Sequence, residues 1–200
     1  SQIPEASDTE KESALKTALA TMAEVGLTSV HDAGVDADTI ALFQRFAEKG
    51  ALSTRIYAMV AGTGDDFDRV AANGPVLDLE NDRLVVRAVK LVADGALGSR
   101  GAAMLAPYSD DPKNYGLRFH RQEALVAMMG KAISKGFQVN VHAIGDGGNR
   151  QVLDAYSMAY QQYGGRDLRH RMEHAQIVSL GDIARFVPLQ LIASMQPTHA

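Results

Sequence analysis

The feature that most constrains the fold is a strict alternation of short apolar segments with longer amphipathic segments. The short segments have the length and composition of strands, and the longer ones carry apolar residues at helical spacing. We expect strands at Leu27–His31, Leu52–Val60, Leu84–Ala93, Phe137–Ile144, Arg169–Ala175 and Leu191–Met195. We expect helices at residues 9–25, Thr39–Lys49, Asp65–Ala72, Arg121–Lys135, Asn149–Tyr163 and Leu180–Phe186. Such an alternation predicts parallel βαβ units in an α/β protein.

The spacing and one strand pattern favour a barrel over an open sheet. The six strands begin about 33 residues apart on average, close to the about 31 residues that each unit of a (β/α)8 barrel takes. The strand at Phe137–Ile144 places Gln138, Asn140 and His142 on one face and valines on the other. An open doubly wound sheet would be apolar on both faces because helices cover both. Six strands do not close an eight-stranded barrel, so we expect an incomplete (β/α)8 TIM barrel.

Composition excludes several classes of protein and of site. The chain has 200 residues, of which 46% are hydrophobic and 22% charged, as expected for one globular domain over residues 1–200. A net charge of −4 provides no general field for nucleic acid. The absence of cysteine excludes disulfides, a thiol nucleophile and a thiolate zinc site. No segment approaches the roughly 20 apolar residues of a membrane helix, and the first residues resemble no signal or transit peptide. We expect no membrane partner and a cytoplasmic location.

Histidines gather at the predicted strand ends. His31, His142 and His174 stand at or near such ends, and His199 follows the sixth strand. The carboxyl ends of barrel strands converge on one face, where imidazoles from different strands can bind a divalent metal. We expect the side chains of His142 and His174 to lie within roughly 15 Å of each other. The alternative is that each histidine is an ordinary polar loop residue. We expect His170 to be structural, because four strand residues span about 13 Å and place it far below His174.

Lys90 stands among hydrophobic residues in a predicted strand. Burial lowers the pKa of a lysine and frees its amine. The free amine can form a Schiff base with a carbonyl substrate, or react with carbon dioxide to give a carbamate that can bridge two metal ions. The plainer alternative is a lysine paired with Asp94 or another acid.

A long loop and a glycine-rich turn follow two of the strands. Arg100 lies in the loop after Ala93 and can hold a substrate carboxylate, or be a solvated loop residue. The turn at residues 145–148 lacks both the P-loop and the dinucleotide fingerprint, so it supports phosphate binding only weakly.

Five sequence blocks carry a family resemblance. They are residues 26–34, 89–100, 141–146, 172–176 and 194–199. They resemble consecutive blocks of the amidohydrolase superfamily, and the most similar branch is the YtcJ-like, N-substituted-formamide-deformylase-like metal-dependent hydrolases of amidohydrolase family 3. The blocks follow the family order, and the resemblance covers nearly the whole chain.

The resemblance implies a distorted (β/α)8 barrel with one or two divalent metal ions, usually zinc. Lys90 matches the family's lysine on the fourth strand, which is often carboxylated, and His142 and His174 match the ligands on the fifth and sixth strands. These three are therefore expected as metal ligands and catalytic residues. Arg100, Asp146 and His199 are expected as substrate contacts.

Parts of the family pattern have no counterpart here. The His-x-His pair of the first strand, the Asp after the eighth strand and the small β-sandwich are absent, and residue 1 is not Met. We therefore expect a piece of a longer enzyme, about strands two to seven, that is inactive alone. The resemblance implies hydrolysis of a non-peptide amide-type carbon–nitrogen bond in a small molecule by metal-activated water.

Three further expectations accompany this interpretation. One alternative function is a Schiff-base lyase that uses Lys90, and another is a non-catalytic barrel fragment. Because Leu27–His31 and Leu191–Met195 would be open sheet edges, we also expect self-association into a homo-oligomer.

Overall fold

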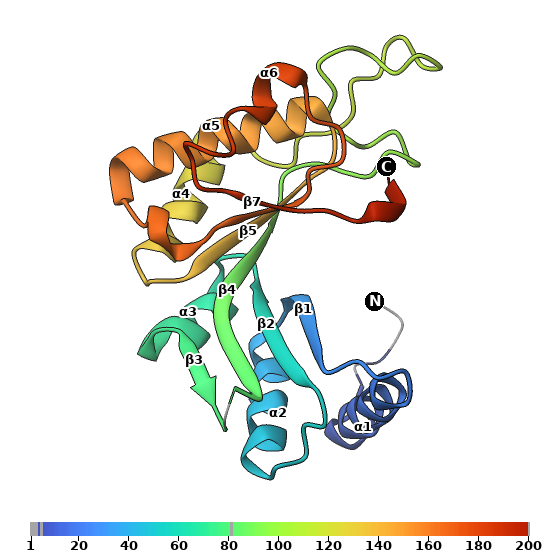
Figure 1. Cartoon of the computed structure of the whole chain (residues 1–200), viewed down its shortest axis with the longest axis vertical. Helices are drawn as coiled ribbons and strands as arrows, with labels where there is room; N and C mark the ends of the chain where they lie inside the picture. The colour runs from blue at the N-terminus through green and yellow to red at the C-terminus, as the bar shows by residue number, and fades with distance from the viewer. Residues whose placement is uncertain (1–3, 5, 81, 200) are drawn as a thin grey trace.

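Six parallel strands form one curled sheet, as the computed structural model shows for residues 4, 6–80 and 82–199, except for the side chain of His199 (Figure 1). In spatial order they are β1 (Ser29–Val35), β2 (Arg55–Ala61), β4 (Leu84–Val92), β5 (Gln138–Ala143), β6 (Arg171–His174) and β7 (Ile192–Ser194). All five pairings between these neighbours are parallel. The expected incomplete TIM barrel is confirmed.

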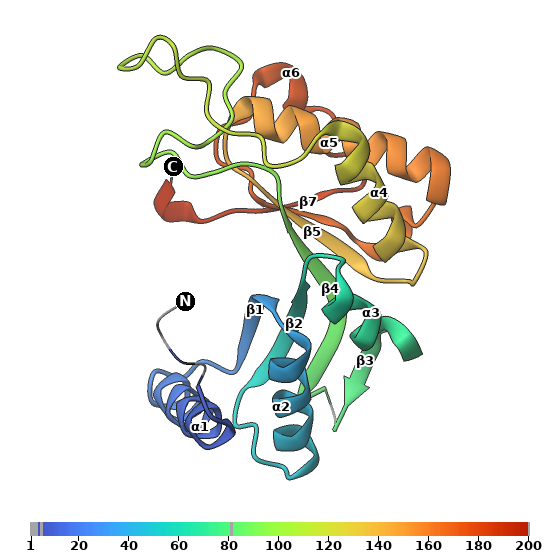
Figure 2. The ribbon, with the colours of Figure 1, turned by 180° about the vertical axis from the view of Figure 1, so that it is seen from behind.

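The helices follow the strands in the order that the sequence predicts. They are α1 (Asp8–Glu24), α2 (Ala37–Glu48), α3 (Asp65–Val70), α4 (Gln122–Ile133), α5 (Asp146–Tyr163) and α6 (Leu180–Ile183). Short 3-10 turns lie at Ala71–Asn73, Arg166–Leu168 and Pro197–His199. Figure 2 shows α4 and α5 side by side, next to β5. Local signals start two of the helices: Ser7 and Glu10 form a capping box at α1, and Asp36 accepts from the Thr39 backbone N–H at α2.

The outer face of the sheet forms the hydrophobic core. The strand residues Val89, Leu91, Val139 and Val141 are buried there with helix residues such as Leu125, Met129 and Tyr156. Burying one such valine or leucine side chain contributes about 1.5–3 kcal/mol. The inner face is different, because its strands carry polar side chains. Tyr57 donates a hydrogen bond to Gln138 Oε1 at 2.7 Å. Asn140 and His142 lie two residues apart on β5, so they share one face of the strand. The polar inner face expected from β5 is therefore present.

The strands differ from the sequence prediction in two places. The sequence Asp32-Ala33-Gly34 does not close the first strand, because β1 continues to Val35 through an irregularity between Ala33 and Val35. Gly34 takes φ +109° there, a conformation that glycine adopts without strain. The sequence interpretation also missed β3 (Val76–Leu79), which pairs antiparallel with the first half of β4.

None of the helices in the described residues is long and apolar enough to cross a membrane.

Candidate functional site

His142 and His174 meet at the carboxyl end of the sheet. His142 is the next-to-last residue of β5, and His174 is the last residue of β6. The two strands are neighbours, with Ala143 opposite His174 in the ladder. The ring centroids are 4.6 Å apart, and the ring planes meet edge to face at 76°. The expectation that these two side chains converge is confirmed.

The environment favours the neutral form of the His142 ring. Burial lowers the pKa of His142, and the positive charges of His174 and Lys90 lower it further. A neutral imidazole retains a lone pair on one nitrogen, which is the form that binds metals. His142 Nε2 lies 3.5 Å from both the Gly95 carbonyl oxygen and Asp94 Oδ1. On the other ring, Nδ1 lies 2.8 Å from Gln196 Oε1.

Lys90 is a half-buried lysine on β4, opposite Asn140 of β5. Burial lowers the pKa of its amine, an effect that the negative charge of Glu173 partly opposes. Among the described residues, no ion pair joins Lys90 to a carboxylate. The pairing with Asp94 is therefore not formed, and the amine is more easily deprotonated than that of an ordinary lysine.

Asp94 instead ties together the loops around His142. Its side chain is fully buried and accepts hydrogen bonds from three backbone N–H groups, those of Ala103, Ile144 and Gly145, at 2.8–2.9 Å. Gly148 allows this approach, because a Cβ there would lie 2.4 Å from Asp94 Oδ2. A buried carboxylate is costly unless it is hydrogen-bonded in this way. The long loop after β4 is thus fixed to the turn between β5 and α5.

Arg100 and Asp146, which were expected to contact substrate, interact with other residues of the protein. Arg100 forms an exposed ion pair with Asp110, with Nη2 2.7 Å from Oδ2. Asp146 Oδ1 accepts from the Leu105 backbone N–H at 2.8 Å and from that of Gly147 at 2.9 Å. The roles of Arg100 and Asp146 in binding substrate stay predictions. The His199 side chain lies outside the described residues.

His31 does not join the two histidines at the sheet end. It is the third residue of a seven-residue strand, so the strand continues for four residues beyond it. Its Nδ1 lies 3.1 Å from Arg171 Nη1, and its ring packs against Tyr57. The expected placement of His31 at a strand end is therefore wrong, because β1 is longer than predicted.

His170 lies buried at the opposite end of β6, as the spacing predicts. Its Nδ1 accepts from the Val139 backbone N–H at 2.8 Å, and its Nε2 lies 2.9 Å from the Gly165 carbonyl oxygen. Burial lowers its pKa to about 4. It is a structural residue of the core.

The sequence interpretation missed the polar residues next to the histidines. Arg171 and Glu173 form a nearly buried ion pair at 2.7 Å on the inner face of β6. Arg171 and Glu173 alternate with buried Met172, and this alternation could have placed both on one face of β6. The β5–β6 register puts Glu173 on the same face of the sheet as Asn140. Gln196 had no such signal, because it follows β7 in an irregular segment.

The described residues fit part of a metal-binding set. Two imidazoles and one desolvated lysine lie on three adjacent strands, and neutral imidazole is a common ligand for zinc and other transition metals. No group of three or more His, Cys, Asp or Glu side chains that could hold a metal occurs in the described part of the chain. Further ligands are needed to complete a centre.

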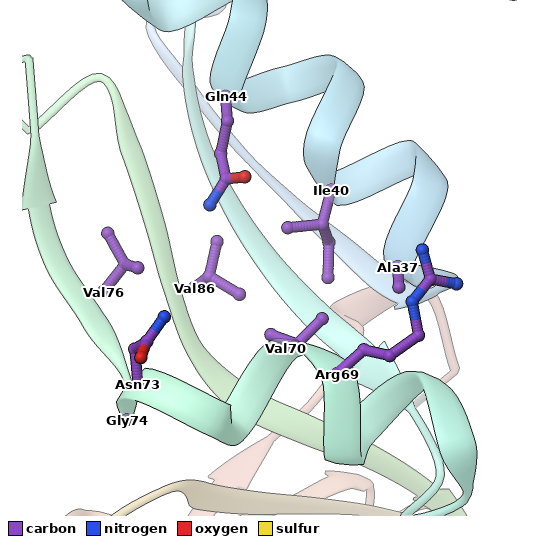
Figure 3. Close-up of a pocket in the computed structure, with 9 residues that line it drawn as sticks. All are labelled: Ala37, Ile40, Gln44, Arg69, Val70, Asn73, Gly74, Val76 and Val86. Atoms are coloured by element: carbon purple, nitrogen blue, oxygen red, sulfur yellow. The ribbon is translucent and has the colours of Figure 1, made fainter.

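Two cavities that a small molecule could enter lie beside the sheet. A cavity of about 300 Å³ lies between α2, the Val70–Gly74 turn, β3 and β4 (Figure 3). It contains one charged residue, Arg69, which pairs with Asp38 and Asp66, so it offers no reactive group. A second depression, of about 410 Å³, lies where β1, β2 and β4 end and includes Lys90 and His120. This depression reaches Lys90 but neither His142 nor His174.

Comparisons with known proteins point to one group. The family model described as the amidohydrolase family matches residues 1–200. The Arabidopsis thaliana "Protein LONG AFTER FAR-RED 3" is 35% identical over 164 residues, which is 82% of this chain and 28% of that protein. The "Putative amidohydrolase YtcJ" of Bacillus subtilis (strain 168) is 39% identical over 110 residues, which is 55% of this chain and 20% of that protein.

A solved structure is also similar to this chain. An uncharacterized metal-dependent hydrolase from Pyrococcus horikoshii OT3 superposes with a TM-score of 0.83 at 29% identity, over 94% of this chain and 37% of that one. The chain thus spans 20–37% of the length of these relatives.

Proposed function

Because this chain belongs to the amidohydrolase family, we propose that it supplies part of the metal centre of a hydrolase that cleaves a non-peptide amide-type carbon–nitrogen bond. The observation that carries the proposal is the edge-to-face contact of His142 with His174 at the ends of adjacent strands, with desolvated Lys90 on the next strand. The similarity to an uncharacterized metal-dependent hydrolase supports a divalent metal, for which we propose zinc.

The chain's own residues would hold the ion. His142 and His174 would each offer a ring nitrogen, and the lowered pKa of His142 favours the neutral ring that binds a metal. When bound, a divalent ion supplies Lewis acidity, which lowers the pKa of water and polarises a carbonyl group. The fully buried Asp94 would hold the surrounding loops in place through its hydrogen bonds to three backbone N–H groups.

Lys90 would be the third metal ligand that this chain provides. In the proposal its free amine attacks carbon dioxide, a new N–C bond forms, and one amine proton leaves to solvent. The product is a carbamate that carries a carboxylate at the end of the side chain. The lowered pKa of Lys90 favours this reaction, because the neutral amine is the nucleophile.

The remaining ligands would lie outside the 200 residues. Two histidines and one lysine leave the family's set of ligands incomplete, because the His-x-His pair of the first strand and the Asp after the eighth strand have no counterpart in this sequence. We expect this chain alone to have no appreciable hydrolase activity. Robust metal-dependent hydrolysis of amides by the purified 200-residue chain would contradict that expectation.

The test uses the protein as its gene encodes it, assayed against a panel of N-acyl and N-formyl compounds. We expect hydrolysis that a chelator abolishes and added zinc restores, and that Lys90→Ala eliminates. Lys135→Ala, a change of an exposed lysine, is the matched control and should keep the activity. Borohydride trapping of substrate on Lys90, with turnover insensitive to chelator, would instead support a Schiff-base lyase and overturn the proposal.

A further inference from the structure

We propose that Asn149 is a positioning residue that holds the backbone turn after His174 and thereby keeps the His174 ring against His142. Asn149 is the fourth residue of α5, and it is fully buried. The inference rests on the proposed function for its effect on metal binding, whereas the arrangement of the two rings can be measured without metal.

The backbone turns sharply where β6 ends. His174 has φ +75° and Ala175 has φ +43°, so two successive residues with side chains lie in the left-handed region. That region is unfavourable for such residues, because Cβ comes too close to the following carbonyl oxygen. Strained conformations of this kind persist only where the surrounding structure holds them, and they occur most often at functional sites. The segment that follows His174 must therefore be held in place by its neighbours.

This segment is fastened at Ile177, three residues beyond His174. The Ile177 backbone N–H donates to the Ile144 carbonyl oxygen at 2.9 Å. The Ile177 carbonyl oxygen accepts from Asn149 Nδ2 at 3.0 Å. The first bond joins two backbones, so of the two only the second can be removed by replacing a side chain.

Asn149 joins the segment after β6 to the segment after β5. The two shortest contacts of its Nδ2 are the carbonyl oxygens of Gly145 at 2.9 Å and Ile177 at 3.0 Å. Those of Ala143 and Ile144 lie farther away, at 3.3 and 3.2 Å. Only the nitrogen end of an amide donates, so a group of carbonyl oxygens fixes which way the side chain points. The nitrogen carries two hydrogens, one for each segment.

The two segments follow the strands that carry the two histidines. His142 is the next-to-last residue of β5, and His174 is the last residue of β6. Because one amide holds both segments, it fixes the distance between the strand ends and favours the separation of 4.6 Å between the ring centroids. Gln196 also contacts the His174 ring, from the segment after β7. If Gln196 alone placed the ring, loss of Asn149 would leave the two rings in contact.

Gln151 provides a matched control on the same helix. It is also a buried amide of α5, and its Nε2 donates to the His120 carbonyl oxygen at 2.8 Å. That bond joins α5 to the loop before α4. Gln151→Leu therefore removes one amide hydrogen bond of α5 and leaves the bonds of Asn149 in place.

The first experiment compares crystal structures of the protein as its gene encodes it, freed of metal by a chelator, for the unchanged protein, Asn149→Ala and Gln151→Leu. In the unchanged protein and in Gln151→Leu, we expect a positive φ at His174 and its ring in contact with His142. In Asn149→Ala we expect His174 to leave the left-handed region and the ring centroids to lie more than about 7 Å apart, beyond the range of paired rings. Rings that stay in contact in Asn149→Ala overturn the inference.

Hydrogen exchange read by mass spectrometry tests the same point in solution. The amides of residues 175–178 should exchange about 10-fold faster in Asn149→Ala, because that segment loses one hydrogen bond, and at the unchanged rate in Gln151→Leu. Unchanged exchange in β4 shows that the variant is folded. If Asn149→Ala does not fold, Asn149→Ser takes its place, since its single hydroxyl hydrogen serves only one of the two segments. Equal exchange at residues 175–178 in the folded variant and the unchanged protein overturns the inference.

The second experiment separates this inference from the proposed function. Zinc affinity is measured by competition with a chromogenic chelator in the unchanged protein and the two variants. Loss of a group that orients a metal ligand weakens metal binding by about 10–100-fold, so we expect that loss for Asn149→Ala and little change for Gln151→Leu. If the unchanged protein binds no metal, the proposed function fails while the structural result stands. If it binds zinc and Asn149→Ala binds equally well, this inference fails while the function stands.

Discussion

His170 makes the stability of this fold depend on pH, and replacing it with asparagine should remove that dependence. The ring is fully buried before β6, with Nδ1 accepting from Val139 N–H and Nε2 donating to the Gly165 carbonyl oxygen. The rings of Tyr156 and Tyr160 lie on it, with centroids 5.6 Å away. A proton on Nδ1 would face the Val139 N–H and would have to be buried as a charge.

The size of the effect follows from the pKa values of the two states. Burial lowers the pKa of His170 from 6.5 to about 4, with the charge of Asp167 opposing this and that of Arg87 adding to it. The unfolded chain therefore binds the proton more readily than the folded chain, and the free energy of unfolding falls as the pH falls from about 6.5 to about 4. Each pKa unit corresponds to 1.36 kcal/mol, so the full loss is about 3 kcal/mol, of which about 2 kcal/mol occurs between pH 7 and pH 5.

The assay is urea unfolding of the unchanged chain and of His170→Asn at a series of pH values. Asparagine Oδ1 can take the place of Nδ1 as acceptor for Val139 N–H but does not titrate. The variant loses the ring contacts at every pH, so it starts less stable. The difference between the two proteins should shrink by about 2 kcal/mol between pH 7 and pH 5. If the free energy of unfolding of His170→Asn fell with pH in parallel with that of the unchanged chain, the argument would be refuted.

Three further predictions concern the site, its loop and the sheet edges. In the protein as its gene encodes it, Lys90→Ala should lose bound metal and turnover, and full metal content with normal turnover would refute its ligand role. Asp94→Ala removes the acceptor of three backbone hydrogen bonds, each of about 1.5–3 kcal/mol, so limited proteolysis should cut residues 95–119 faster, while the exposed change Asp110→Ala should have little effect. β1 and β7 are the open edges of the sheet, so the isolated chain should self-associate in light scattering, and a stable monomer at high concentration would count against this.

Local patterns were sufficient to predict most of the fold. Helices and parallel strands follow from apolar periodicity, and Gln138, Asn140 and His142 revealed a polar inner face because side chains alternate strictly along a strand. The convergence of His142 with His174 followed from topology alone, since parallel strands end on the same side of a sheet.

What the sequence did not reveal depends on tertiary contacts. β1 passes through Asp32-Ala33-Gly34, where the residues resemble a turn, because pairing with β2 continues to Val35. The contact of Asp94 with the turn at Gly145 joins positions 51 residues apart, and the contact of Gln196 with His174 joins positions 22 apart. Neither spacing is periodic, so no pattern along the chain could indicate them.

The central claim is that His142, His174 and Lys90 belong to one metal centre, and metal content tests it most directly. Zinc bound per chain would be measured by mass spectrometry of the elements in the protein as its gene encodes it, after dialysis, for the unchanged protein and for His142→Ala, His174→Ala and the exposed control Lys135→Ala. We predict bound zinc in the unchanged protein and in Lys135→Ala, and its loss in both His142→Ala and His174→Ala, with the fold retained by circular dichroism. Equal zinc in all four proteins, or none in the unchanged protein, would contradict the claim.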